Sequence, residues 1–188
     1  MFTDAQSNEA RVPLPAGATL HVEGRSLTAR GPLGSVRRPF PSDVVRLEVK
    51  GHEVVLTLGI AANRKRAQAL LRAWAAHVAN LTTGVTVGFE ARMKVVAAHF
   101  PMKVQVKEDH LLIENFLGEK HPRSAPLVPG VSAAVEGDYV VISGPDVELV
   151  GQSAANIERA TRIREYDPRV FQDGIYLTER AHPKRGAE

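Results

Sequence analysis

The same succession of secondary-structure signals occurs twice along the 188 residues, and this internal repeat most constrains how the chain can fold. Leu47–Leu56 and Ala133–Ile142 each contain two short valine-rich strands around a glycine-containing turn, which is typical of a β-hairpin. Each hairpin leads into a helical segment. We therefore expect one fold used twice, in an N-terminal repeat over residues 1–82 and a C-terminal repeat over residues 83–188 with a basic tail.

Helical periodicity follows each hairpin. A first helix is expected from about residue 63 to residue 81, where apolar side chains recur three and four positions apart and Gly84 soon follows as a stop: Ala67, Leu70, Leu71, Trp74, Val78 and Leu81. A second, less regular helix is expected over residues 152–163. A glycine-led strand is predicted after each helix, at Gly84–Val87 and at Gly174–Leu177.

Further strands precede the hairpins at Leu20–Arg25 in the first half, and at Val104–Lys107 and Leu111–Glu114 in the second. Gly34 and Gly118 end the units that these strands form, in equivalent places. Short strands with one helix per repeat, and no strand–helix–strand alternation, indicate an α+β class. We expect two tandem, topologically similar domains, each an antiparallel β-sheet packed on one face by an α-helix. The ends, residues 1–11 and 181–188, are expected to be mobile tails.

Composition excludes several classes. The absence of cysteine fits a reducing cytoplasm and removes thiolate zinc sites and cysteine nucleophiles. The N-terminus lacks a basic segment followed by an apolar run, so no signal peptide is expected. The most apolar windows are too short to cross a bilayer, so no membrane partner is expected. These features predict a soluble, cytoplasmic protein.

The search for reactive side chains finds no convergent set. The seven histidines are scattered singly, and none lies three or four residues from another, so no metal site is expected. Arg30–Ser35 has two glycines, but no helix pattern opens there to cradle a phosphate. No Gly-x-Ser-x-Gly elbow occurs. We expect no enzyme, no cofactor and no small-molecule substrate, although carboxylates distant in sequence leave a small hydrolase as an alternative.

The net charge is only +3, and its distribution says more than its size. Acids outnumber bases from Val104 to Glu148, whereas bases outnumber acids from Arg159 to Arg185. This pattern suits a chain that meets an anion with one end, and it equally suits a solvated charged surface. A protein-interaction module that presents Glu136 and Asp138 to a basic partner is a second hypothesis.

Two short loops of the second half suit structured RNA, which is bound mainly through its shape, phosphates and 2′-hydroxyls. Residues 118–123 form a proline-stiffened loop with projecting bases, and residues 167–174 combine a stiff turn with an arginine and amide donors. The aromatic residues near these loops are expected in the core at strand positions: Phe116, Phe171 and Tyr176. A platform for stacked bases is therefore not expected.

Five segments of the second half occur in a familiar order: His99–Met102, Ile113–Lys120, Ser143–Asp146, Val150–Glu158 and Arg169–Tyr176. Together with Gly31–Gly34 and Ala76–Thr86, they resemble the large-subunit ribosomal protein family numbered six in bacteria and archaea and nine in eukaryotes. The resemblance covers about residues 11–180. The segments Glu114–Lys120 and Phe171–Gly174 look archaeal. Tyr166 and Ser124 depart from the family, which often carries basic residues there.

The resemblance implies a duplicated α+β fold in a structural constituent of the large ribosomal subunit, without catalysis or cofactor. It implies that the protein binds large-subunit ribosomal RNA, chiefly through its C-terminal domain, near the elongation-factor site and stalk base. Neighbouring ribosomal proteins and translation factors are its implied partners. The match to the family's loops identifies as RNA contacts Lys120, Arg123, Arg169, Gln172 and Arg180, with His121 inside the first loop. Charge position alone adds Arg162, Arg164, Lys184 and Arg185.

Overall fold

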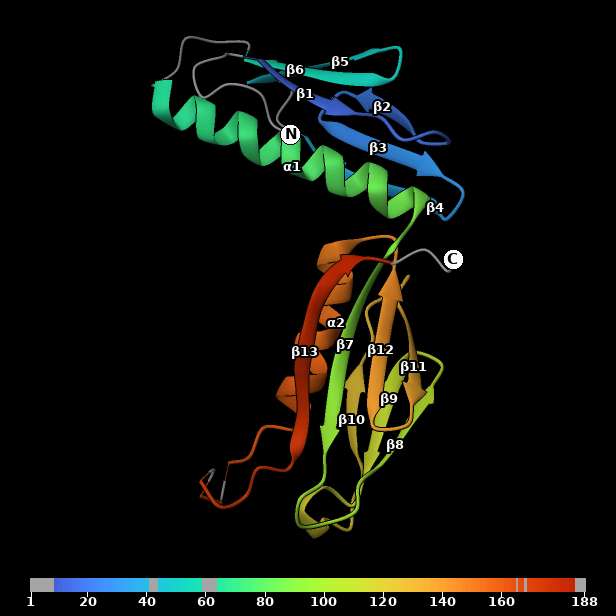
Figure 1. The fold of residues 1–188 in the computed structure, drawn as a ribbon, viewed down its shortest axis with the longest axis vertical. Helices are drawn as coiled ribbons and strands as arrows, with labels where there is room; N and C mark the ends of the chain where they lie inside the picture. The colour runs from blue at the N-terminus through green and yellow to red at the C-terminus, as the bar shows by residue number, and fades with distance from the viewer. Residues whose placement is uncertain (1–8, 41–43, 59–63, 165, 168, 185–188) are drawn as a thin grey trace. The chain divides into compact units, whose positions relative to one another are not determined.

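A computed structural model describes residues 9–40, 44–58, 64–164, 166–167 and 169–184. The chain divides into two compact units, Met1–Val87 (unit 1) and Gly88–Glu188 (unit 2). Each unit combines antiparallel strands with one α-helix, which confirms the expected α+β class and the repeat (Figure 1). The units are described separately below.

Unit 1 contains two three-stranded antiparallel sheets and one helix. The first sheet has the order β1 (Glu9–Pro13), β6 (Glu53–Leu58), β5 (Val45–Lys50). The second has the order β2 (Thr19–Glu23), β3 (Ser26–Gly31), β4 (Gly34–Pro39). Both sheets share one buried cluster with α1 (Arg64–Thr86). The ring of Phe40 meets Trp74 of α1 edge-on, with ring centroids 4.9 Å apart, so the aromatic pair lies in this core.

The first helix runs past its expected end. α1 continues through Gly84 to Thr86, so the strand predicted at Gly84–Val87 is wrong. A glycine inside a helix costs about 1 kcal/mol, whereas burying Leu81 and Val85 in the core stabilises by roughly 1.5–3 kcal/mol each. The hydroxyl of Thr86 also donates to the carbonyl of Thr82 at 2.9 Å, which satisfies a late helical acceptor. The units divide after Val87, whereas the sequence predicted a boundary after residue 82.

Unit 2 also has two antiparallel sheets on one core. The three-stranded sheet has the order β10 (Arg123–Pro126), β9 (His110–Glu114), β8 (Lys103–Lys107). The four-stranded sheet has the order β11 (Ser132–Glu136), β12 (Tyr139–Gly144), β7 (Phe89–Val96), β13 (Gly174–Pro183). The helix α2 (Val147–Ala160) packs on this core, and a short 3-10 turn η1 (Phe116–Gly118) follows β9. Each unit thus has two sheets where one was expected, joined by a single apolar cluster.

The second helix begins and ends earlier than its periodicity indicated. Asp146 caps its start, because the carboxylate accepts the N–H of Glu148 at 2.8 Å. Thr161 closes its end, and its hydroxyl lies 3.3 Å from the carbonyl of Ile157. The stretch expected as helix at residues 161–163 is therefore loop.

Parts of both expected tails are strands. Glu9 to Arg11 belong to β1 and pair with residues 55–57 of β6. Ala181 to Pro183 belong to β13, where His182 pairs with Glu90 of β7. Backbone hydrogen bonds to a neighbouring strand thus order segments whose composition alone resembles a tail.

Candidate nucleic-acid interface

Three loops of unit 2 lie together at one end of its strands. They are residues 97–102 between β7 and β8, residues 115–122 between β9 and β10, and residues 161–173 between α2 and β13. Figure 1 shows the first two at the bottom of the view and the third beside them. We call these three segments the loop end. Hydrogen bonds that cross from one loop to the next hold them together.

Buried Asp173 joins the first loop to the third. Its carboxylate accepts the backbone N–H groups of His99 at 2.9 Å and Phe100 at 3.4 Å, and His99 Nδ1 lies 2.8 Å away. Burial alone raises the pKa of Asp173, but the hydrogen bonds from His99 and Phe100 outweigh it and leave the pKa below its ordinary value. Asp173 is therefore ionised at neutral pH and fixes two loops against each other.

The second loop is held in an unusual backbone conformation. Asn115, Leu117 and Gly118 have φ values of 59°, 50° and 76°, in the left-handed region. The two non-glycine positions cost roughly 1–2 kcal/mol each, and burial of Phe116 and Leu117 offsets that cost. The side-chain amide of Asn115 donates to the carbonyl of Pro101 at 3.0 Å, which ties this loop to the first. Gly118 thus has a positive φ, which glycine adopts without a steric cost.

Arg123 points inward rather than away from the loop. Its guanidinium donates to both carboxylate oxygens of Glu119, at 2.8 and 2.5 Å. It also donates to the carbonyls of Ala160 at 2.8 Å and Arg162 at 3.3 Å, and it lies 4.2 Å above the ring of Phe116. Four of its five donors are thus used inside the protein. Arg123 therefore positions the second and third loops, and its expected RNA contact stays a prediction.

The same contact changes the electrostatics of the second loop. The hydrogen bond from Arg123 is the main cause that lowers the pKa of Glu119 below its ordinary value. Glu119 and Arg123 therefore stay paired at neutral pH and contribute no net charge. The positive charge of the loop end comes from other residues.

Those residues are the exposed lysine and arginines of the second and third loops, with His121 and Gln172 exposed near them: Lys120, Arg162, Arg164 and Arg169. None of the lysine and arginine side chains in this group forms an ion pair with another described residue. A turn built by Asp167 supports Arg169, because the Asp167 carboxylate accepts the Arg169 N–H at 2.9 Å. The structure therefore brings together most of the residues expected to contact RNA.

The remaining expected residues lie elsewhere. Arg180 is exposed farther along β13, and Lys184 follows that strand, with its N–H donating to the carbonyl of Gly88 at 3.0 Å. The end of β13 lies at the opposite end of unit 2 from the loops (Figure 1). Arg185 lies outside the described residues. Sequence position near the basic terminus thus does not place Arg180 and Lys184 at the loop end.

The aromatic side chains differ from the expectation of a purely internal role. Phe116 is buried and Phe171 is half-buried, but Tyr176, which pairs with Lys94 of β7, is 45% exposed. Its ring covers Gly174, where a Cβ would lie 2.9 Å from the Tyr176 ring. A side chain at Gly174 would therefore require the end of the Tyr176 ring to move.

A second group of rings lies on the third loop. Phe171 packs between His99 and Tyr166, with ring centroids 4.7 and 4.8 Å away. Tyr166, a departure from the family pattern, is 48% exposed at the edge of this group. Aromatic surface is therefore accessible near the cations, and whether it serves as a platform for stacked bases stays a prediction.

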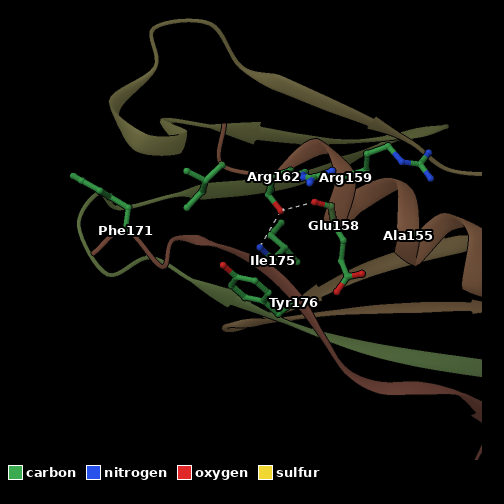
Figure 2. A pocket seen from close by; sticks show the side chains of 9 residues that line it. Ala155, Glu158, Arg159, Arg162, Phe171, Ile175 and Tyr176 are labelled. Atoms are coloured by element: carbon green, nitrogen blue, oxygen red, sulfur yellow. Dashed lines mark hydrogen bonds between the residues drawn. The ribbon is translucent and has the colours of Figure 1, made fainter. Parts of the chain in front are cut away.

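An open pocket of about 630 Å³ lies between the end of α2 and the start of β13. We call it the α2–β13 pocket, and it is lined by Ala155, Glu158, Arg159, Thr161, Arg162, Ile163, Phe171, Ile175 and Tyr176. Figure 2 shows the arginines on the helix side and Tyr176 across from them. Arg159 was not among the expected contacts. Its position three residues before Arg162, at a helix end that favours cations, was the available signal.

The structure gives little support to the two alternative functions, a small hydrolase and a protein-interaction module. Among the described residues, no group of three or more histidine, aspartate or glutamate side chains is arranged to hold a metal ion. In the same residues, no helix is long and apolar enough to cross a membrane. On the acidic hairpin, Glu136 pairs with Arg92 at 3.5 Å, so part of that surface already has a basic partner.

Comparison with known proteins agrees with the repeat. The family described as Ribosomal protein L6 matches residues 14–88 and again residues 100–174. The chain is similar to the large ribosomal subunit protein uL6 of Ignicoccus hospitalis, with 47% identity over 91% of this chain and 94% of the relative. The corresponding proteins of Methanosarcina mazei and Methanobrevibacter smithii are 43% and 45% identical over 90% and 88% of this chain, which is 96% and 92% of each relative.

Proposed function

Because the chain belongs to the ribosomal protein L6 family, we propose that it binds large-subunit ribosomal RNA through the loop end of unit 2. The family is one of structural ribosomal components and not of enzymes. In this role the protein supports translation in the cytoplasm, with ribosomal RNA and neighbouring ribosomal proteins as partners. We further propose that it lies near the elongation-factor site and the stalk base, with translation factors as neighbours.

One observation carries the RNA-binding proposal. Lys120, Arg162, Arg164 and Arg169 are exposed without acidic partners among the described residues, on loops held by Asp173 and Arg123. Cations held in place before binding lose less conformational entropy when they meet phosphates. Folded RNA is recognised largely through its sugar–phosphate backbone, which such a surface fits. The proposal is thus supported by the exposed positive charges and by the contacts that hold their loops in place.

Removal of three loop-end cations tests the proposal. We expect Lys120→Ala combined with Arg164→Ala and Arg169→Ala to weaken binding to transcribed large-subunit ribosomal RNA. Each phosphate contact releases counterions, so the log–log salt slope should become shallower by about 0.7–0.9 per contact, or roughly 2–3 in total. Binding is measured by filter retention at rising salt. The charge-matched control combines Arg30→Ala, Arg46→Ala and Lys107→Ala, all exposed and outside the loop end. Equal slopes for the two triple variants would contradict the proposal.

The location in the subunit needs a separate test, which the absence of native cysteine makes simple. Ser124→Cys gives a single exposed thiol beside the second loop, to which an iron chelate can be attached. In reconstituted large subunits we expect hydroxyl radicals from this position to cleave ribosomal RNA at the elongation-factor site and stalk base. Ser35→Cys, exposed in unit 1, is the matched position. Cleavage from position 124 confined to distant RNA would refute the location and leave the RNA-binding proposal standing.

A further inference from the structure

We propose that the α2–β13 pocket receives one unstacked ribonucleotide of the bound RNA, with its base against Tyr176 and its flanking phosphates near Arg159 and Arg162. This inference rests on the proposed RNA-binding function and names a contact within it. A nucleotide is suited to a pocket with three features: a planar apolar wall, hydrogen-bond acceptors for its donors, and cations at the rim for its phosphates. The α2–β13 pocket has all three.

The apolar part of the pocket matches the face of a base. Ile163, Phe171 and Ile175 line it, and Tyr176 adds an aromatic wall that is 45% exposed. Bases without stacked neighbours bind aromatic side chains, and every base offers such a face. The volume of about 630 Å³ lies within the range typical of small-molecule pockets, roughly 300–1,000 Å³. One nucleotide therefore fits, and a helical RNA segment does not.

Tyr176 is fixed before any ligand arrives. Its hydroxyl donates to the carbonyl of Gln172 at 3.2 Å, and its ring rests on Gly174, where even a Cβ would be too close. Both contacts involve the hydroxyl end of the side chain, and together they orient the ring. A ring that is already ordered loses little entropy when a base packs on it.

Charged groups distinguish a nucleotide from a free anion. Glu158 reaches toward the β13 side of the pocket, where its Oε1 accepts the Leu177 N–H at 3.0 Å (Figure 2). A carboxylate held there repels a phosphate inside the pocket, but its remaining lone pairs accept hydrogen bonds from a ribose hydroxyl or a base amino group. Arg159 extends away from Tyr176 in the same view, toward the rim. Phosphates therefore belong outside and the nucleoside inside.

Both arginines are available for that role. Neither Arg159 nor Arg162 forms an ion pair with another described residue. They lie at the carboxyl end of α2, where the helix dipole stabilises cations. The pocket also adjoins the third loop, which carries Arg164 and Arg169, so an RNA strand that crosses the loop end meets further exposed arginines. A single nucleotide turned out of that strand enters the pocket.

Chemical probing of the base tests the proposal. Full-length protein is bound to transcribed large-subunit ribosomal RNA, and the RNA is treated with reagents that modify accessible base edges and ribose hydroxyls. We expect the wild type to protect one unpaired nucleotide that Tyr176→Leu leaves reactive, with the other protections kept. Loss of the ring should weaken binding by roughly 5- to 100-fold, the usual effect of removing a base-stacking side chain. Tyr139→Leu, at the other exposed tyrosine opposite Lys94, is the matched control.

The arginines give a second, independent readout. Arg159→Ala should make the salt slope shallower by about 0.7–0.9, whereas Lys107→Ala on β8 should not change it. Because Arg159 is exposed, this variant remains informative even where Tyr176→Leu fails to fold. Unchanged base protection with Tyr176→Leu, or an unchanged slope with Arg159→Ala, in a protein that binds RNA normally would overturn the pocket proposal alone. Failure of the wild type to bind RNA would overturn the proposed function as well.

Discussion

The two units build one junction, a strand-to-strand turn against the end of a helix, from different atoms. In unit 1, the backbone N–H of Leu33 donates to the carbonyl of Val85 at 2.9 Å, near the end of α1. In unit 2, the equivalent segment lies between β9 and β10, and the side chain of Arg123 reaches the carbonyls of Ala160 and Arg162 beyond α2. In both units the turn satisfies carbonyls that a helix end leaves without partners.

The difference shows how a duplicated fold acquires a binding surface in one copy. A backbone hydrogen bond requires a short, close turn, and unit 1 has one between Gly31 and Gly34. A long side chain bridges a larger gap, which leaves room in unit 2 for the loop at residues 115–122. That loop carries Lys120 and packs against the loop at residues 97–102. Unit 2 therefore depends on side-chain contacts at a place where unit 1 depends on main-chain contacts.

The largest expected effect is at Asp173, whose side chain joins two loops of unit 2. Asp173→Asn replaces an acceptor-only group with an amide that faces two backbone N–H donors and a histidine ring. Loss of these charge-assisted hydrogen bonds should destabilise unit 2 by about 2–3 kcal/mol. Urea unfolding followed by circular dichroism measures the loss. The only tryptophan, Trp74, lies in unit 1, so its fluorescence transition should not move.

The same carboxylate predicts a pH dependence with a definite sign. Its pKa in the folded protein is below the ordinary value of 3.8, so its stabilising effect is complete at neutral pH. That effect is lost as the pH falls from about 4 through the folded pKa. The stability difference between the wild type and Asp173→Asn should therefore shrink below about pH 4. A difference that stays constant down to pH 3 would show that Asp173 does not act as a carboxylate.

A smaller effect is expected from Gly31, and it should appear only in unit 1. A Cβ at Gly31 would lie 2.5 Å from the Val85 carbonyl oxygen and 2.9 Å from the Val85 carbonyl carbon, so the turn and helix must separate. Gly31→Ala should destabilise unit 1 by about 2 kcal/mol, within the range of overpacking substitutions. Trp74 fluorescence during unfolding reports it. Gly34→Ala meets nothing within 4 Å and should cost less, about 1 kcal/mol, through its φ of 115°.

The smallest effect separates positioning from RNA contact at Arg123. Arg123→Gln removes the bidentate pair with Glu119 and the bonds to the α2 end, and it should destabilise unit 2 by about 1–2 kcal/mol. Because the guanidinium is used inside the protein, the salt slope of RNA binding should stay within about 0.3 of the wild-type value. Arg169→Ala should reduce that slope by about 0.7–0.9 without a stability loss. A slope change of that size in Arg123→Gln would restore the expected RNA contact.

Local chemistry made much of the fold predictable. Both hairpin turns were identified from glycines that adopt positive φ, Gly51 at 62° and Gly137 at 59°, because the turn type requires a residue without a Cβ. The helix end predicted near Gly84 was wrong because it depends on contacts outside the local sequence. Whether a helix continues there depends on burial of Val85 against strands that begin some fifty residues earlier, which periodicity within the helix does not reveal.

The sequence could predict which cations belong to the candidate site, but not how their side chains are arranged. The charge and loop position of Lys120, Arg164 and Arg169 made them predictable, and in the structure all three are exposed on these loops. Arg123 carries the same signal and points inward, because its partners Ala160 and Arg162 lie across the fold. The bond between His99 and Asp173 joins residues 74 positions apart, and nothing in either neighbourhood marks them as a pair. Contacts between distant segments decide which loop cations remain free.

The pairing of β13 with β7 can form only late in the synthesis of the chain. β7 opens unit 2, whereas β13 is the last strand among the described residues, so β7 gains its second neighbour only after residues 174–183 have been made. Every strand and the helix of unit 1 have by then been made. Until that moment one edge of β7 has no neighbour, and an unpaired edge invites association with other chains. In a newly made copy, pairing of β13 thus closes this edge of β7, and a copy truncated before β13 would leave the edge open.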